Sequence, residues 1–283
     1  MSDQPPPQKT GRYARELTTL VAAPLLIWLC GWAPHGYFIA GMGLACTLGL
    51  YEFLVLGEKK GYPVQKSLSI ALMWLILAAF LLPQLSVEVA VFAVLLILPA
   101  TFVFTVRELD TALPATAVCV LGTLYLGMMG GTILRMRLDF GDVDGRHLMF
   151  FLFVVVWIGD AGAYYVGKTF GKTRLWPRVS PKKTVEGGLG GVATAILAAA
   201  VIHFTFFQNF PLVHALIAAA LLSVTGVIGD LAESLWKRSA DVKDSGALIP
   251  GHGGFLDRSD SILFTAPILY GYWFLLAHNF RLT

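Results

Sequence analysis

Long apolar runs, separated by short polar stretches, recur along almost the whole 283-residue chain. A helix needs about 20 mostly apolar residues to cross the hydrocarbon core of a bilayer. Stretches close to that length lie at 17–34, 36–56, 67–83, 87–106, 114–134, 147–167, 189–208, 211–235 and 261–279. The pattern predicts an all-α polytopic integral membrane protein with about nine transmembrane helices.

The composition agrees with a membrane protein. Hydrophobic residues make up 56% of the chain, charged residues only 14%, and the mean hydropathy is +0.69, which is typical of membrane rather than soluble proteins. Cys30, Cys46 and Cys119 lie inside apolar stretches without metal-binding spacing, so we interpret them as small hydrophobic residues. Residues 1–16 are polar and proline-rich and lack the features of a removable signal peptide, so we expect a disordered cytoplasmic tail and a retained first helix.

The basic residues predict the orientation. With a cytoplasmic N-terminus, 17 of the 21 Lys and Arg residues face the cytoplasm, and only Arg135, Arg137, Arg146 and Arg281 face the other side. Because cytoplasmic loops carry an excess of Lys and Arg, we expect the N-terminus and the polar loops 168–188 and 236–260 in the cytoplasm, and the C-terminus on the opposite side.

The chain divides into two unequal parts. Residues 17–135 hold the first five helices and few ionisable groups. Glu52 is an exception near the cytoplasmic end of its helix, where snorkelling or a polar contact would satisfy it. Residues 136–283 hold the last four helices and both polar loops, so we expect this second part to be the catalytic region.

Two aspartates end apolar runs in the second part. Asp160 and Asp230 each follow the dipeptide Ile-Gly. An ionised carboxylate in or near hydrocarbon is costly unless it is paired, binds a cation or lines a watery cavity, and the glycine leaves room for a close backbone approach. Lysine partners would give a purely structural account, but a functional site is the favoured interpretation.

Helical spacing gathers further polar groups around Asp230. Glu233, Ser234 and Lys237 follow it at spacings that share one helix face, and Asp257 and Asp260 lie one turn apart before the last helix. Carboxylate oxygens, few in number, are the ligands that Mg²⁺ prefers, so the favoured metal ligands are Asp230, Asp257 and Asp260. Asp257 and Asp260 could instead only cap the last helix.

Basic and glycine-rich residues complete the pattern. Lys237, Arg238, Lys243 and Arg258 could neutralise phosphate oxygens, and "PGHGG" (250–254) offers unobstructed backbone N–H groups. The stretch "SPKKTVEGGLGG" (180–191) has the same character. Together these features indicate a site for a phosphate-rich, metal-bound substrate.

One motif match is interpreted as accidental. "GAYYVGKT" (162–169) fits the P-loop pattern, but a P-loop requires a strand before it and a soluble α/β domain around it. Here the match ends a membrane-length apolar stretch, which predicts a helix.

The segment "SLWKRSADVKDSGALIPGHGGFLDRSD" (234–260) resembles the signature of the phosphatidate cytidylyltransferases, S-x-x-K-R, four residues, K-D-x-G, then P-G-H-G-G-x-x-D-R-x-D. The resemblance extends upstream through "GDLAES" (229–234) and residues 159–191, and covers about the last 130 residues. Trp236, where an aliphatic residue or Phe is usual, and Ser259, where an apolar residue is usual, depart from the pattern.

The resemblance implies that CTP and phosphatidic acid give CDP-diacylglycerol and pyrophosphate, with Mg²⁺, at the cytoplasmic membrane of a bacterium. It also implies a homodimer, and no nucleic-acid partner is expected. The catalytic residues would be Asp230, Asp257, Lys237, Arg238, Lys243 and Arg258. The substrate-binding residues would be Asp160, Ser180, Lys183, Thr184, Glu186, Asp244, His252, Gly253 and Gly254.

Three alternatives stay open. The lipid acceptor could be other than phosphatidic acid, such as a polyprenol phosphate or an archaeal ether lipid, because no sequence feature of the first five helices identifies the acceptor. A transporter could also carry intramembrane acids, although its acids tend toward the midplane and between inverted repeats. A catalytically inactive relative would be expected to have lost an acid or a lysine of the signature, and all are present.

Overall fold

The computed structural model describes residue 20, residues 23–246 and residues 253–280, the last with side chains up to residue 277. Residues 23–31 are helical. The elements that follow are α2 (His35–Lys59), α3 (Lys66–Leu81), α4 (Val87–Thr105), α5 (Leu109–Leu138), α6 (Gly141–Phe170), β1 (Arg174–Trp176), β2 (Ser180–Thr184), α7 (Val185–Thr205), α8 (Leu212–Ser239) and α9 (Leu256–Phe280).

The predicted polytopic helical fold is confirmed. Seven of these helices, α2 and α4 to α9, are long and apolar enough to cross a membrane. Helix α3 is apolar but has only 16 residues, about 24 Å at 1.5 Å per residue, and the first predicted span is described only in part. The number of spans and their orientation therefore stay predictions.

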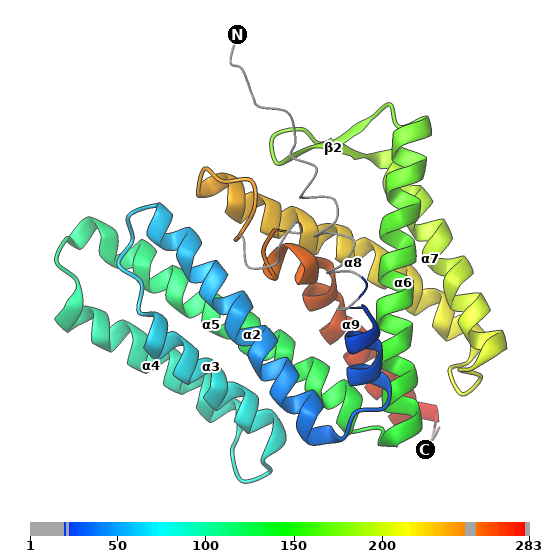
Figure 1. Ribbon diagram of the computed structural model, residues 1–283, viewed down its shortest axis with the longest axis horizontal. Helices are drawn as coiled ribbons and strands as arrows, with labels where there is room; N and C mark the ends of the chain where they lie inside the picture. Colours follow the sequence, from blue (N-terminus) through cyan, green and yellow to red (C-terminus); the bar gives the residue numbers. More distant parts are fainter. Residues whose placement is uncertain (1–19, 21–22, 247–252, 281–283) are drawn as a thin grey trace.

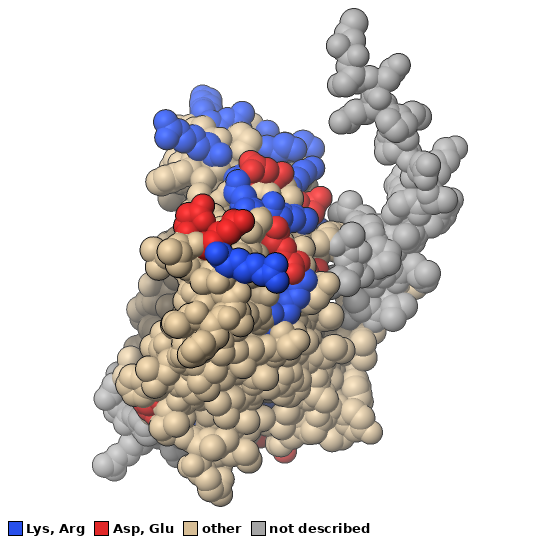
Figure 2. All heavy atoms as spheres, turned by 90° about the vertical axis from the view of Figure 1, so that its left-hand side faces the viewer, with Lys and Arg blue, Asp and Glu red and all other residues tan. Residues whose placement is uncertain are grey.

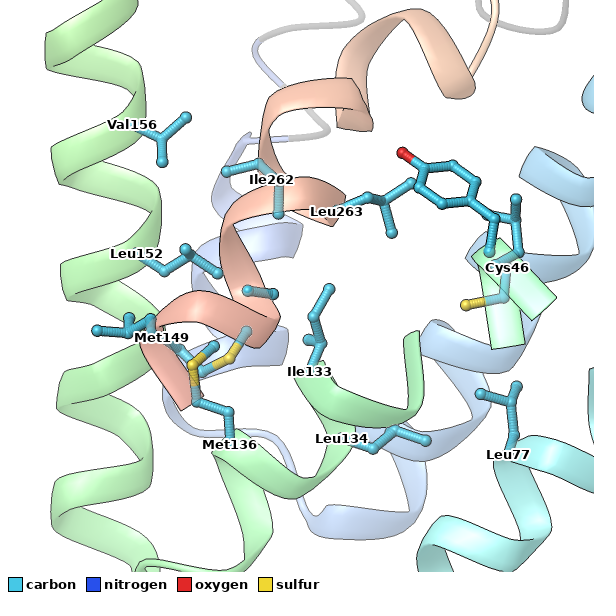
Figure 3. Packing of buried hydrophobic residues seen from close by; sticks show 14 of the residues in the cluster. Cys46, Leu77, Ile133, Leu134, Met136, Met149, Leu152, Val156, Ile262 and Leu263 are labelled. Carbon is cyan, nitrogen blue, oxygen red and sulfur yellow. The ribbon is translucent and has the colours of Figure 1, made fainter. Parts of the chain in front are cut away.

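The helices form two neighbouring groups. Helices α2 to α5 lie on one side of Figure 1 and α6 and α7 on the other, with α9 between them, while α8 crosses the view from beside α7 toward the first group. Helix α9 packs against α8, α5, α6 and α2. Figure 3 shows the buried side chains at this junction, where Ile262 of α9 points toward α6, which carries Leu152 and Val156, and Leu263 points to the opposite side of α9. Helix α9 therefore joins the two halves of the chain.

Several helices extend beyond the predicted apolar runs. Helix α8 continues to Ser239 rather than 235, and α9 begins at Leu256 rather than 261. Their polar ends continue the backbone hydrogen bonding of the apolar runs, which hydropathy alone does not detect. As a result Lys237 and Arg238 lie on α8, and Asp257 and Asp260 lie in the first two turns of α9.

The predicted loop 168–188 contains a two-stranded antiparallel hairpin, in which Arg174 pairs with Thr184 and Trp176 with Ser180. No strand is predicted here because β2 reads "SPKKT", which lacks the apolar alternation of a half-buried strand. Glu186 accepts hydrogen bonds from the backbone N–H groups of Lys172 and Thr173 and so ties the hairpin to α7.

The interpretation of "GAYYVGKT" as an accidental match is confirmed. Residues 162–169 lie within the continuous helix α6, which ends at Phe170. A helical backbone donates its N–H groups to its own carbonyls, so this segment cannot form the phosphate-cradling loop of a P-loop.

A glycine sets the approach of α8 to α9. A methyl group at Gly229 would lie 2.7 Å from Cβ of Phe264 and 2.9 Å from the carbonyl oxygen of Asp260, whereas at Gly226, three residues earlier, the nearest atom is 3.5 Å away. The sequence prediction that the glycine before Asp230 permits a close backbone approach is therefore confirmed.

We predict that Gly229→Ala lowers the free energy of unfolding by about 1–3 kcal/mol, the usual cost of overpacking. Gly226→Ala is the matched control, because both substitutions bring the same gain in helix propensity and only the first meets a clash. The measurement is thermal unfolding of both variants in detergent. Equal midpoints for the two variants would contradict the packing account.

Candidate active site

Charged side chains gather at one end of the helical bundle. Figure 2 shows Lys, Arg, Asp and Glu together there, above a body whose visible surface is almost entirely uncharged. This end is formed by the β1–β2 hairpin and by the α8–α9 connection (Figure 1). The two polar segments that the sequence singled out therefore meet in space.

The polar stripe predicted on α8 is confirmed. Ser234 donates a hydrogen bond from Oγ to Oδ1 of Asp230 at 3.2 Å, and Nζ of Lys237 lies 3.0 Å from Oε1 of Glu233. The Glu233 side chain is only 1% exposed, and its Oε2 has no hydrogen-bond partner among the described residues. The stripe thus faces the protein interior and carries an unsatisfied carboxylate oxygen.

Asp257 joins this stripe to the α8–α9 connection. Its Oδ1 lies 2.5 Å from Nζ of Lys237. Its Oδ2 accepts hydrogen bonds from the backbone N–H and the hydroxyl of Ser245 and from the backbone N–H of Gly254, each at 2.9 Å. The carboxylate therefore organises the connection before α9 while its other oxygen pairs with α8.

The hairpin contributes a lysine to the same site. Nζ of Lys183, on β2, lies 2.7 Å from Oδ2 of Asp230 on α8. Asp160, on α6, is close enough to both side chains for their charges to interact. The segment 180–187, which the resemblance assigns to substrate binding, therefore reaches Asp230 through Lys183.

Five carboxylates and two lysines make up this centre, which we call the carboxylate cluster: Asp160, Asp230, Glu233, Asp257 and Asp260 with Lys183 and Lys237. Acids outnumber bases, and like charges this close repel one another unless a cation compensates them. Within the described part of the chain, no three acidic, His or Cys side chains are already arranged as a metal site.

The donor set nevertheless suits a hard cation. Mg²⁺ usually takes only one or two protein carboxylates and completes its shell with water and substrate phosphates. The excess of carboxylates and the unpaired Oε2 of Glu233 fit such an ion. The prediction that Asp230, Asp257 and Asp260 bind it stays a prediction.

The remaining predicted residues fall into two groups. Thr184 is buried and its Oγ1 accepts a hydrogen bond from the N–H of Gly187 at the start of α7, so its visible role, like that of Glu186, is to position the hairpin. Exposed or partly exposed residues at the charged end are Ser180, Arg238, Lys243, Asp244, Gly253 and Arg258. His252 lies outside the described residues.

Glu52 has a role that sequence reasoning missed. It comes from α2, in the first half of the chain, and its side chain is buried. Its carboxylate accepts hydrogen bonds from the N–H of Phe255 at 3.0 Å, from the N–H of Leu256 at 2.9 Å and from the hydroxyl of Ser245 at 3.1 Å. The single proton of this hydroxyl is shared with Asp257, whose Oδ2 lies 2.9 Å from the same oxygen.

These contacts make Glu52 a positioning residue. An acid at a helix N-terminus satisfies free N–H groups and complements the helix dipole, and here it fixes the start of α9 one residue before Asp257. The available signal was the acid itself: a glutamate within an apolar helix needs a buried partner. The partners lie about 200 positions away, which no spacing rule predicts.

Trp236, which departs from the signature, packs against two aromatic residues of the first half of the chain. Its ring contacts Phe53 of α2 and Tyr125 of α5, with ring centroids 5.1 and 5.3 Å apart. Ser259, the other departure, donates a hydrogen bond to the carbonyl of Phe255. Both side chains therefore support the frame around the carboxylate cluster.

We predict that Glu52→Gln lowers the free energy of unfolding by about 1–3 kcal/mol, because an amide has one acceptor oxygen and leaves a buried donor unpaired. Tryptic cleavage after Lys243 should also become faster. Glu58→Gln is the control, since Glu58 lies on the same helix, is exposed and forms its one ion pair among the described residues with Lys66. The measurements are thermal unfolding and timed proteolysis in detergent. Equal unfolding midpoints and equal cleavage rates for the two variants would contradict the account.

Comparison with known proteins places the chain in a family. The model of the cytidylyltransferase family matches residues 13–276. A phosphatidate cytidylyltransferase of Bacillus subtilis is 38% identical over 275 residues, which cover 93% of this chain and 97% of that protein. One from Synechocystis is 33% identical, with 94% and 97% covered, and one from Staphylococcus saprophyticus is 42% identical over 153 residues, 54% of this chain and 57% of that protein. The chain therefore belongs to the cytidylyltransferase family, and its similarity to the phosphatidate cytidylyltransferases extends over both halves of the bundle.

Proposed function

We propose that the protein is a CTP:phosphatidate cytidylyltransferase, which converts CTP and phosphatidic acid into CDP-diacylglycerol and pyrophosphate. The observation that carries the proposal is the carboxylate cluster at one end of a membrane-type bundle, where lysines from two polar segments lie against the acids. The match to phosphatidate cytidylyltransferases over more than nine-tenths of the chain supports the same reaction.

In this reaction the lipid phosphate is the nucleophile. The second pKa of a phosphate monoester is near ~6, so the group is mostly dianionic at neutral pH and needs no general base. An oxygen of the lipid phosphate forms a bond to the α-phosphorus of CTP, while the bond from that phosphorus to the bridging oxygen breaks and pyrophosphate leaves. The protein has to align two anions and screen their repulsion.

The lysines are placed for that task. Lys183 and Lys237 are only 23% and 12% exposed, and a charge held in such a partly desolvated place acts more strongly than one in water. Arg238 and Lys243 form no ion pair with a carboxylate of the described residues. We assign all four, with Arg258, to the phosphates of CTP and of the lipid.

Asp230, Asp257 and Asp260 are the proposed Mg²⁺ ligands. A divalent ion here would neutralise phosphate charge and the leaving pyrophosphate. Asp160, Ser180, Asp244, His252, Gly253 and Gly254 are the proposed remaining contacts to the substrates.

The proposed setting is the cytoplasmic side of a bacterial inner membrane, and the bacterial relatives support it. Phosphatidic acid reaches the site from the bilayer, since many large apolar side chains of the helices are exposed. The excess of Lys and Arg at this end supports a cytoplasmic face, which in a bacterium is that of the inner membrane, where CTP is available. A homodimer is part of the proposal.

Two alternatives are less well supported. A different phospholipid or polyprenol phosphate acceptor would use the same cluster, and a panel of acceptors distinguishes it. A transporter is disfavoured because the acids gather with the polar connections at one end of the helices (Figure 2) rather than at mid-depth.

We predict that the purified protein in detergent micelles makes CDP-diacylglycerol and pyrophosphate from CTP, phosphatidic acid and Mg²⁺. EDTA should abolish turnover, and Asp257→Asn should lower kcat/KM on the order of 10²-fold or more, as loss of a key electrostatic group does. Asp241→Asn is the matched control, because Asp241 lies in the connection between α8 and α9, is exposed and pairs with Lys60. Turnover that survives Asp257→Asn would remove the metal assignment. No product at all from the folded protein would overturn the proposed function.

We predict a second contrast between neighbouring lysines of β2. Lys183→Gln should lower kcat/KM for CTP by about tenfold or more, because it removes a partly buried charge beside Asp230. Lys182→Gln should change it less than about threefold, since that side chain is exposed. Steady-state kinetics with varied CTP would contradict the role of Lys183 if both variants lost activity equally.

A further inference from the structure

A second polar site lies at the opposite end of the bundle. A pocket of about 450 Å³ is lined by Trp32, Pro34, His35, Arg137, Asp142 and Arg146, with Gly31 and Ala33. Arg146 and Asp160 are both on α6 and 14 positions apart, which is about 21 Å along a helix. The pocket is therefore separate from the carboxylate cluster.

Arg137 is buried in the wall of this pocket with an unsatisfied group. Its side chain is 5% exposed, and its Nε donates a hydrogen bond to the carbonyl of Cys30 at 3.0 Å. Its Nη1 has no hydrogen-bond partner in the described part of the chain and lies 3.6 Å from Oδ1 of Asp142. A buried guanidinium with a free donor is costly unless an acceptor completes it.

A second guanidinium faces the same pocket. Arg146 lies over the ring of Trp32 at 5.9 Å from its centroid and pairs with no carboxylate of the described residues. The single acid of the pocket, Asp142, is shared, because its Oδ1 lies 3.0 Å from Nε2 of His35 as well as near Arg137. Two arginines against one acid leave the pocket with a net positive charge.

The surrounding side chains indicate where the anion comes from. Trp28, Trp32 and Tyr37 are large aromatic residues that are exposed beside the pocket. Trp and Tyr favour the headgroup level of a bilayer, and guanidinium groups bind phosphate oxygens through paired N–H donors.

We propose that this pocket binds the phosphate group of an anionic phospholipid in the leaflet opposite the carboxylate cluster. The phosphate oxygens would accept from Nη1 of Arg137 and from Arg146, while the acyl chains would lie along the exposed apolar surface of the neighbouring helices. The inference does not depend on the proposed function, because it concerns different residues and a lipid that does not react.

The test is binding of phosphatidylglycerol to the delipidated protein in detergent, by native mass spectrometry and by the lipid-dependent shift of the unfolding midpoint. Arg146→Gln should weaken this binding about tenfold or more, the effect of losing a charge-assisted contact. Arg135→Gln should leave it unchanged, because Arg135 lies at the same end but outside the pocket, over the Phe80 ring. Arg137→Lys, which keeps the positive charge but removes the paired N–H donors of the guanidinium, should also weaken the binding of phosphatidylglycerol.

Parallel samples with other ligands test whether the pocket recognises the phosphate group alone or a phosphate carried by a lipid. Diacylglycerol, which lacks the phosphate, should not bind in an Arg146-dependent way, and excess inorganic phosphate should compete only weakly. Inorganic phosphate that binds while phosphatidylglycerol does not would overturn the lipid assignment. Equal binding of phosphatidylglycerol to the native protein, Arg146→Gln and Arg135→Gln would overturn the site. CTP turnover and the lipid-free unfolding midpoint of Arg146→Gln should equal those of the native protein, which excludes misfolding as the cause.

Discussion

Carboxylates placed at the end of a membrane bundle must find compensation within the protein, and this requirement organises the second half of the chain. An isolated buried charge is unstable in a medium of low polarity. Asp230 pairs with Lys183 of the hairpin, Glu233 and Asp257 share Lys237, and Asp257 also holds Ser245 and Gly254. The Glu233–Lys237 pair lies within α8, but the other contacts join separate segments of the chain. The contacts that compensate these charges therefore also assemble the site.

The same requirement couples the two halves of the protein. The apolar helices of the first half could be regarded as a membrane anchor, but Glu52 of α2 holds the first N–H groups of α9 and shares Ser245 with Asp257. Trp236 adds an aromatic contact from α8 to Phe53 and Tyr125. A change in the packing of α2 therefore reaches the carboxylate cluster through one shared hydroxyl group.

A feature could be predicted from the sequence when the residues that form it are close together along the chain. The helices and the stripe from Asp230 to Lys237 rest on local periodicity, and the structure confirms both. The length of α8 and α9 was underestimated because helices continue past their apolar runs. The hairpin was missed because its strands are polar, and the role of Glu52 was missed because its partners are remote in sequence. The specific pairing of Lys183 with Asp230 was not predicted, since no local rule joins β2 to α8.

The most direct test of the account is the fate of each phosphorus atom of CTP. We would supply the purified protein with phosphatidic acid and with CTP labelled with ³²P at either the α or the γ position, and then separate lipid from water-soluble products. The account predicts that the α label enters the lipid as CDP-diacylglycerol while the γ label stays in water as pyrophosphate. A γ label in the lipid would mean phosphoryl transfer. If neither label entered the lipid, the carboxylate cluster would not perform this reaction.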